Sequence, residues 1–86
     1  MSVVFLHSVL IYLGFLSTLI HLSINGNSRH FEVSELSVTQ LVAMLGLEGK
    51  RLALERNGEI VPRSQFAQTL LASGDQLEIV GAVGGG

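Results

Sequence analysis

Hydrophobic and polar residues alternate at several places along the chain, and each such place predicts a β-strand, because a period of two separates the two faces of a strand. The first stretch covers residues 20–24. It is followed by Asn25-Gly26, a dipeptide that suits the positive φ angles of a tight hairpin turn. Phe31 and Val33 then alternate with polar neighbours. The pattern therefore predicts a β-hairpin at this point of the chain.

One helix is predicted after the hairpin, from three signals at its start. Ser37 suits the N-cap position, and Gln40 three residues later completes a capping box. Leu36 and Leu41 have the spacing of a hydrophobic staple across the same boundary. Gly46 can adopt the left-handed conformation that ends a helix. We expect a short helix of about nine residues that lays one apolar stripe on the sheet.

A second hairpin is predicted further along. Leu52 and Leu54 alternate with polar residues, and Asn57-Gly58 suits another tight turn. A short return strand follows and ends before Pro62, because the proline nitrogen cannot donate a hydrogen bond to a sheet.

The last strand is predicted near the C-terminus, after residues 63–71, whose pattern fits neither strand nor helix clearly. Leu77 and Ile79 form the apolar side of this strand, and Val83 extends that side if the strand continues. The order of elements predicts an α+β fold in which a mixed sheet of four to five strands clasps one short helix. We expect this domain to span residues 20–81, with its first and last strands in the centre of the sheet.

Residues 1–19 have a different character. All twelve charged residues of the chain lie after residue 28, and residues 2–19 are apolar over the minimum length of a membrane-spanning helix. No basic residue precedes the run, as one would in a secretory signal, and no spacer separates it from the domain. A start-site extension is favoured, with Leu19 as the true initiator; a membrane or interfacial helix and a signal peptide stay open. In each case we expect residues 1–19 to lie outside the core.

The composition removes several function classes. Hydrophobic residues make up 48% of the chain and charged residues 14%, which is typical of a chain that folds. Five basic residues and a net charge of −2 give no basic face for nucleic acid. Cysteine is absent, which excludes disulfides and thiolate metal sites. His21 and His30 are too few ligands for a zinc site, and Asp75 lacks the signature of a Ser-His-Asp hydrolase.

The chain ends in AVGGG, residues 82–86. Such an end is typical of a flexible terminus. It also suits a chemical role, because a terminal glycine carboxylate is the least hindered acyl group that a chain can present. Glycines before it can enter a narrow active-site channel. Because the carboxylate is ionised and unreactive, a separate enzyme must activate it, for instance as an acyl-adenylate.

From residue 20 onward the chain resembles the ubiquitin-like β-grasp sulfur-carrier proteins, and most closely the ThiS-type carriers of thiamine biosynthesis. The matching stretches are INGNSRHF in the first hairpin, NGEIVPRSQF around the second turn, GDQLEIV in the last strand and AVGGG at the end. The Val-Pro-Arg sequence together with the glycine end makes the resemblance fairly specific. Residues 1–19 match nothing in that family.

The resemblance implies a cytoplasmic sulfur carrier for the thiazole ring of thiamine, a protein co-substrate and not an enzyme. Gly86 would be adenylated by a ThiF-type adenylating enzyme with ATP and Mg, and then converted to a thiocarboxylate with sulfur from a sulfur donor protein. Gly84 and Gly85 would be the segment that passes through the narrow channel to the active site of the enzyme. A ThiG-type thiazole synthase would take the sulfur. The carrier itself would bind no cofactor. A membrane would be a partner only if residues 1–19 form a genuine membrane helix.

A partner enzyme is expected to dock on the exposed face of the sheet that leads to the tail. We expect its apolar contacts to be Leu54, Ile79 and Val83. Glu78 is the candidate for a charged pair at the rim, together with Glu55.

Two alternatives stay open. The small subunit of molybdopterin synthase shares the fold and the Gly-Gly end, but works in a stable complex with a catalytic large subunit. A ubiquitin-like interaction module would have a tail that is never activated. The short length after residue 20 and the Val-Pro-Arg sequence favour the thiamine carrier.

Overall fold

The computed structural model describes residues 19–81. Strands β1 and β2 come first, followed by the α-helix, two further strands, a 3-10 turn and a last strand. Their bounds are β1 (Leu19–Ile24), β2 (Asn27–Glu32), α2 (Val38–Met44), β3 (Leu52–Arg56), β4 (Glu59–Ile60), η1 (Arg63–Gln65) and β5 (Gln76–Gly81). β1 thus begins one residue before the predicted position.

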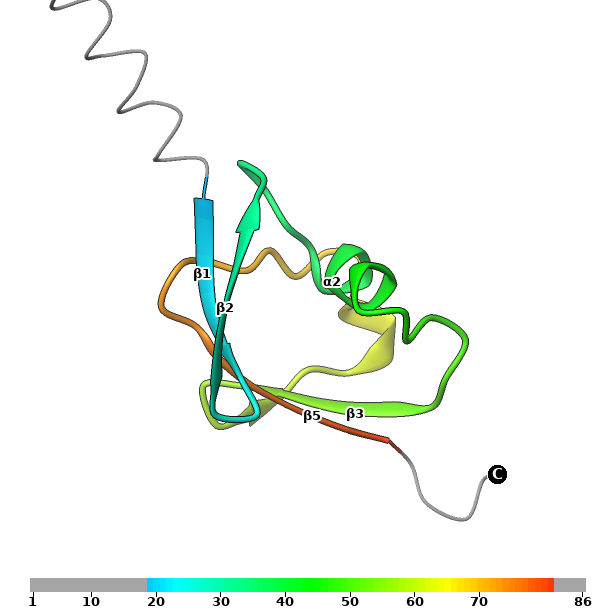
Figure 1. Ribbon diagram of the computed structural model, residues 1–86. Helices are drawn as coiled ribbons and strands as arrows, with labels where there is room; N and C mark the ends of the chain where they lie inside the picture. The colour runs from blue at the N-terminus through cyan, green and yellow to red at the C-terminus, as the bar shows by residue number, and fades with distance from the viewer. Residues whose placement is uncertain (1–18, 82–86) are drawn as a thin grey trace, which may run out of the picture.

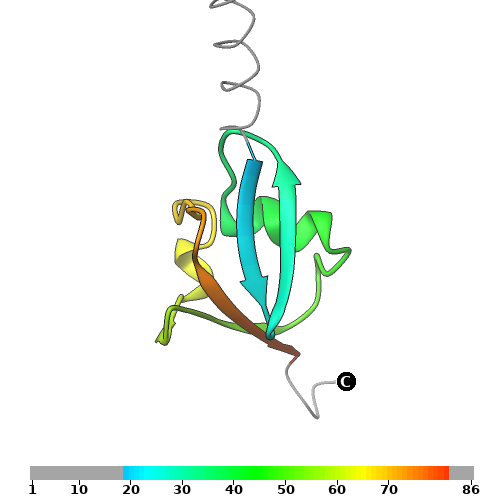
Figure 2. The same ribbon diagram turned by 60° about the vertical axis from the view of Figure 1, so that its left-hand side comes forward.

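The five strands of this segment form one mixed sheet in the order β2-β1-β5-β3-β4 (Figure 1). β1 and β5 are parallel neighbours, with Ser23 opposite Gln76 and Ile24 opposite Leu77. The other pairs of strands are antiparallel. The sheet curves around α2, which lies across one face of the β1–β2 hairpin (Figure 2). The prediction of a mixed β-grasp sheet of four to five strands with its first and last strands inside is confirmed, and the number of strands is five.

Both predicted Asn-Gly turns are present and have the same backbone conformation. Asn25 and Gly26 have φ angles of 52° and 83°, and Asn57 and Gly58 have φ angles of 53° and 88°. Two successive positive φ angles define the hairpin turn whose twist matches that of the flanking strands. These turns fix the register of each hairpin, so that His21 lies opposite His30.

The predicted capping box begins α2. The Ser37 hydroxyl accepts a hydrogen bond from the Gln40 N–H at 3.1 Å, and the Gln40 side chain accepts one from the Ser37 N–H at 2.8 Å. The helix has seven residues between its caps Ser37 and Leu45, against the nine or so predicted. The predicted end at Gly46 is confirmed, because the chain reverses there (φ 73°) and the Leu47 N–H donates to the carbonyl of Val42 at 2.9 Å. This is the Schellman arrangement of a helix end.

Replacement of Ser37 by alanine is expected to lower the free energy of unfolding by about 1 kcal/mol, because it leaves one N–H at the helix start without a partner. Urea denaturation monitored by circular dichroism measures the change. Ser34→Ala removes a hydroxyl from an exposed serine three residues earlier and is the matched control. Equal unfolding midpoints for the two variants would contradict the role of the cap.

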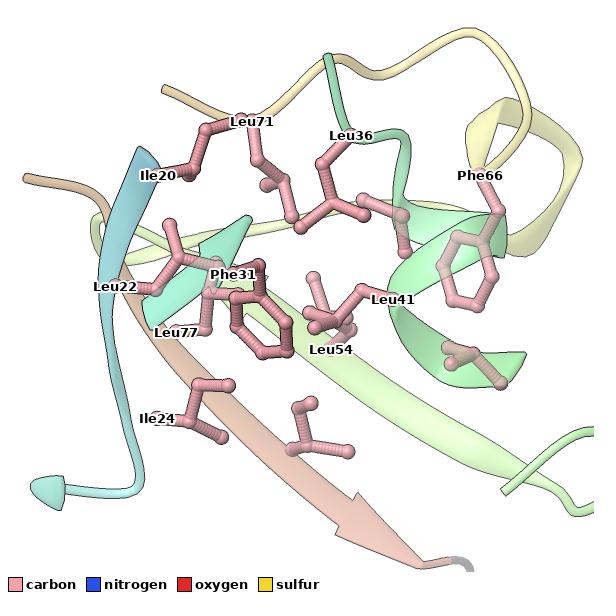
Figure 3. Packing of buried hydrophobic residues seen from close by; sticks show 13 residues of the cluster. Ile20, Leu22, Ile24, Phe31, Leu36, Leu41, Leu54, Phe66, Leu71 and Leu77 are labelled. Atoms are coloured by element: carbon pink, nitrogen blue, oxygen red, sulfur yellow. The ribbon is translucent and has the colours of Figure 1, made fainter. Parts of the chain in front are cut away.

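The core lies between the sheet and α2 (Figure 3). The largest fully buried side chains are Leu36, Leu41, Leu54, Leu77 and Val38. All elements other than β4 and η1 contribute to it, together with the segment after η1. The buried hydrophobic residues are Ile20, Leu22, Ile24, Phe31, Leu36, Val38, Leu41, Val42, Leu54, Phe66, Leu71, Leu77 and Ile79.

Candidate functional site

β5 leads directly to the glycine tail, and its position in the sheet fixes the base of that tail. β3 pairs with β5 along almost its full length, ending with Leu52 opposite Gly81. The predicted site residues Val83, Gly84, Gly85 and Gly86 lie outside the described residues. The structure therefore defines where the tail starts, at the end of an inner strand of the sheet.

Asn25 holds β5 on the edge that faces β1. The strand pairing between β1 and β5 ends where β1 enters its turn, at Ile24 and Leu77. Immediately beyond, the Asn25 Nδ2 donates to the carbonyl of Ile79 at 3.0 Å, and the Asn25 Oδ1 accepts from the Ile79 N–H at 2.8 Å. The side-chain amide of Asn25 thus makes the two hydrogen bonds to β5 that the backbone of a further β1 residue would make. β5 is held on both edges up to Ile79, two residues before Gly81.

Asp75 holds the start of β5. Its carboxylate accepts hydrogen bonds from Arg56 Nε at 2.8 Å, Asn57 Nδ2 at 3.0 Å and the Ala72 N–H at 2.9 Å. The Asn57 Oδ1 in turn accepts from the Gln76 N–H at 2.9 Å. Burial raises the pKa of Asp75, but the hydrogen bonds and the charge of Arg56 outweigh it, and its pKa lies below the ordinary value. This cluster ties the second Asn-Gly turn to β5.

Two residues predicted to contact a partner belong to the core instead. Leu54 is completely buried, and Ile79 is 8% exposed. Leu54 belongs to the same buried cluster as Leu41 of α2 (Figure 3). The prediction placed these two residues on the exposed face of the sheet. They lie on the other face, because the apolar side of a sheet that is covered on one side packs against the helix. The prediction of Leu54 and Ile79 as docking residues is therefore wrong.

The opposite face of β5 and β3 is exposed and carries the other side chains of the alternation. Glu78 lies on this face, directly opposite Glu55. Val80, which sequence analysis did not select, is 58% exposed on the same face, and Ile60 of β4 is 71% exposed. Val80 lies on the side of β5 where the alternation otherwise has the polar residues Gln76 and Glu78, so the pattern does not mark it as a contact residue.

His21, His30 and Arg63 contact other residues of the fold. His21 and His30 face each other across the hairpin, with ring centroids 5.8 Å apart. Within residues 19–81 no three His, Cys, Asp or Glu residues gather into a metal-binding group. Arg63 of the Val-Pro-Arg sequence donates from Nη2 to the carbonyl of Lys50 at 2.6 Å, which ties η1 to the loop before β3. In the same described segment no helix is long and apolar enough to cross a membrane.

A β-grasp sheet with one clasped helix, whose inner last strand leads to a glycine end, defines a small ubiquitin-like carrier domain. Residues 22–86 match the family model described as the ThiS family. The chain belongs to the ThiS family, the sulfur carriers of thiamine biosynthesis.

Three relatives illustrate this membership. The sulfur carrier protein ThiS of Bacillus subtilis is 34% identical over 65 residues, which cover 76% of this chain and 98% of that protein. The crystal structure of the thiamine biosynthesis protein ThiS from Geobacter metallireducens has a TM-score of 0.69 at 30% identity, covering 78% of this chain and 100% of that chain. A thiazole synthase of Paramagnetospirillum magneticum is 48% identical over 65 residues, and this chain spans only 20% of its length.

Proposed function

We propose that this chain carries sulfur as a C-terminal thiocarboxylate on Gly86 and delivers it to thiazole synthase. The observation that carries the proposal is the family match, which includes the glycine end and extends through residue 86. A role as sulfur carrier in thiamine biosynthesis follows from family membership. The proposal adds the chemistry at Gly86 and the partner enzymes.

The proposed chemistry takes place on the terminal carboxylate. A ThiF-type adenylating enzyme uses ATP and Mg: a carboxylate oxygen of Gly86 attacks the α-phosphorus, pyrophosphate leaves, and an acyl-adenylate forms. Hydrosulfide, supplied free in the site by a sulfur donor protein, then attacks the acyl carbon and gives its proton to water. The C–S bond forms as the C–O bond to AMP breaks, which leaves the thiocarboxylate. ATP is bound by the activating enzyme, and the need for it favours the cytoplasm.

In this scheme the chain is a co-substrate and not a catalyst. Its tail enters active sites that belong to other proteins, and Gly84 and Gly85 fit a narrow channel because they carry no side chains. The folded domain supports this role by holding the start of the tail through β3 and Asn25.

The thiazole synthase relative supports the choice of partner. In that protein a segment 48% identical to this chain belongs to the same polypeptide as the rest of a thiazole synthase. Linking two proteins raises their effective concentration for each other, which is useful when the two meet in one reaction. We infer that a thiazole synthase is the partner that takes the sulfur from this chain.

The proposal is tested by incubating the full chain with the adenylating enzyme of its own organism, ATP, Mg and a sulfur donor, and recording the intact mass. We expect a gain equal to the exchange of one oxygen for one sulfur, and no gain when ATP is omitted. An unchanged mass, with an enzyme that adenylates Bacillus subtilis ThiS, would contradict the proposal.

A further inference from the structure

The exposed face next to the base of the tail is a surface with no partner in the described part of the chain. It consists of Ala53, Glu55, Ile60, Glu78 and Val80, and is called the acidic face below. Glu55 lies directly opposite both Ile60 and Glu78, and Ala53 lies opposite Val80. The five residues are therefore contiguous over three strands. Ile60 and Val80 are 71% and 58% exposed, so apolar side chains flank the two carboxylates.

The two carboxylates destabilise the free domain. Side chains directly opposite each other on antiparallel strands lie within about 5.5 Å at their Cβ atoms, and like charges there repel. In the described residues neither Glu55 nor Glu78 forms an ion pair; the one salt bridge there joins Arg56 to Asp75. Stability of the isolated fold therefore gives no reason for the pair. A basic group from outside, placed between them, would convert the repulsion into attraction.

The length of the tail determines which surface a partner must cover. β5 ends at Gly81, and residues 82–86 span at most about 18 Å when fully extended. An enzyme that acts on Gly86 must therefore bring its own surface within this distance of Gly81. Val80 precedes Gly81 directly and Glu78 lies three residues before it, so the acidic face is within reach of such a surface.

We propose that the acidic face docks on the adenylating enzyme, on a surface that presents an arginine side chain between apolar residues. The guanidinium donates to the carboxylates of Glu55 and Glu78, since its planar set of donors suits two neighbouring acceptors. Val80 and Ile60 bury apolar area around this contact and exclude water from it. The inference rests on the proposed function, because the tail must be adenylated for this enzyme to be the partner.

The test uses the full chain and its variants E55Q, E78Q and the double variant, with the adenylating enzyme of the same organism. Adenylation is followed by carrier-dependent ATP–pyrophosphate exchange. We expect the KM for the carrier to rise about tenfold in the double variant and kcat to change little, because the loss is in association. Added salt should raise the KM of the unsubstituted chain more than that of the double variant.

A matched control removes one charge elsewhere. Glu35 is an exposed glutamate between β2 and α2, and E35Q should leave the KM unchanged. The melting temperature of the double variant should equal or exceed that of the unsubstituted chain, because the repulsion is gone. This combination, a weaker substrate that is no less stable, separates docking from damage to the fold.

Three outcomes would overturn the inference. If the double variant has the same KM as E35Q while the unsubstituted chain is adenylated, the acidic face is not the docking surface and the proposed function stands. If the substitutions weaken only sulfur delivery to thiazole synthase, the partner is wrong. If the unsubstituted chain is not adenylated by an enzyme active on a known carrier, the proposed function fails and the inference fails with it.

Discussion

Deletion of Gly86 is expected to abolish thiocarboxylate formation and to leave the fold unchanged. An extended residue spans about 3.3–3.6 Å, so the deletion withdraws the terminal carboxylate by that distance from the reacting phosphate. A misplacement of about 1 Å already reduces such a reaction by about a hundredfold. Intact mass after incubation with the adenylating enzyme, ATP and a sulfur donor measures the result. Because β5 ends at Gly81, we expect an unchanged melting temperature.

A second variant separates the length of the tail from its lack of side chains. Gly86→Ala keeps the carboxylate at its distance from Gly81 and adds one methyl group. We expect it to be adenylated more slowly than the unsubstituted chain, but faster than the deletion variant. Sulfur incorporation by the deletion variant at the rate of the unsubstituted chain would show that Gly86 is not the acceptor. No sulfur incorporation by the unsubstituted chain itself would favour a ubiquitin-like interaction module, whose tail is never activated.

Replacement of Asp75 by alanine is expected to lower the free energy of unfolding by about 3 kcal/mol. The substitution leaves the guanidinium of Arg56, the Asn57 amide and the Ala72 N–H without their acceptor. Because Asp75 is 7% exposed, water replaces that acceptor poorly. Urea denaturation measures the change. A loss of unfolding free energy as small as that of E35Q, a substitution at an exposed residue, would show that the cluster does not stabilise the start of β5.

The charge of Asp75 also predicts how stability depends on pH. Its pKa is lowered in the fold from 3.8, so the unfolded chain binds the proton more tightly than the folded chain. The contribution to stability is therefore complete above pH 3.8 and is lost as the pH falls through the lower, folded value. The difference in unfolding free energy between the unsubstituted chain and Asp75→Asn should be constant at higher pH and shrink below 3.8. A difference independent of pH across this range would contradict the assignment.

Local signals account for the parts of the fold that the sequence predicted well. The two Asn-Gly turns and the capping box of Ser37 act between residues no more than three positions apart, so a short stretch of sequence contains the whole cause. The same holds for the strand alternation around Leu77. The order of elements along the chain and the resemblance predict a β-grasp fold with its first and last strands in the centre of the sheet, and the structure confirms it.

Contacts between distant residues account for what was missed. The positive φ angle of the turn explains why Asn25 is an asparagine. The neighbouring sequence does not show that its side chain also hydrogen-bonds to Ile79, 54 positions later. Alternation marks the apolar face of β3 and β5, and α2 packs against that face, so Leu54 and Ile79 are buried and are not available to a partner. The segment after Pro62 had no clear pattern because tertiary bonds shape it, among them the Leu71 N–H to the carbonyl of Leu36 at 2.8 Å.

The parallel pairing of β1 and β5 places the two ends of the domain apart. The chain enters β1 at one end of the sheet and leaves β5 at the other (Figures 1 and 2). An affinity label, a fluorophore or a whole protein joined ahead of β1 therefore lies at the end of the sheet opposite to Gly81. The domain can be immobilised on a bead or grafted onto a larger assembly through its first strand, which leaves the end of β5 unobstructed.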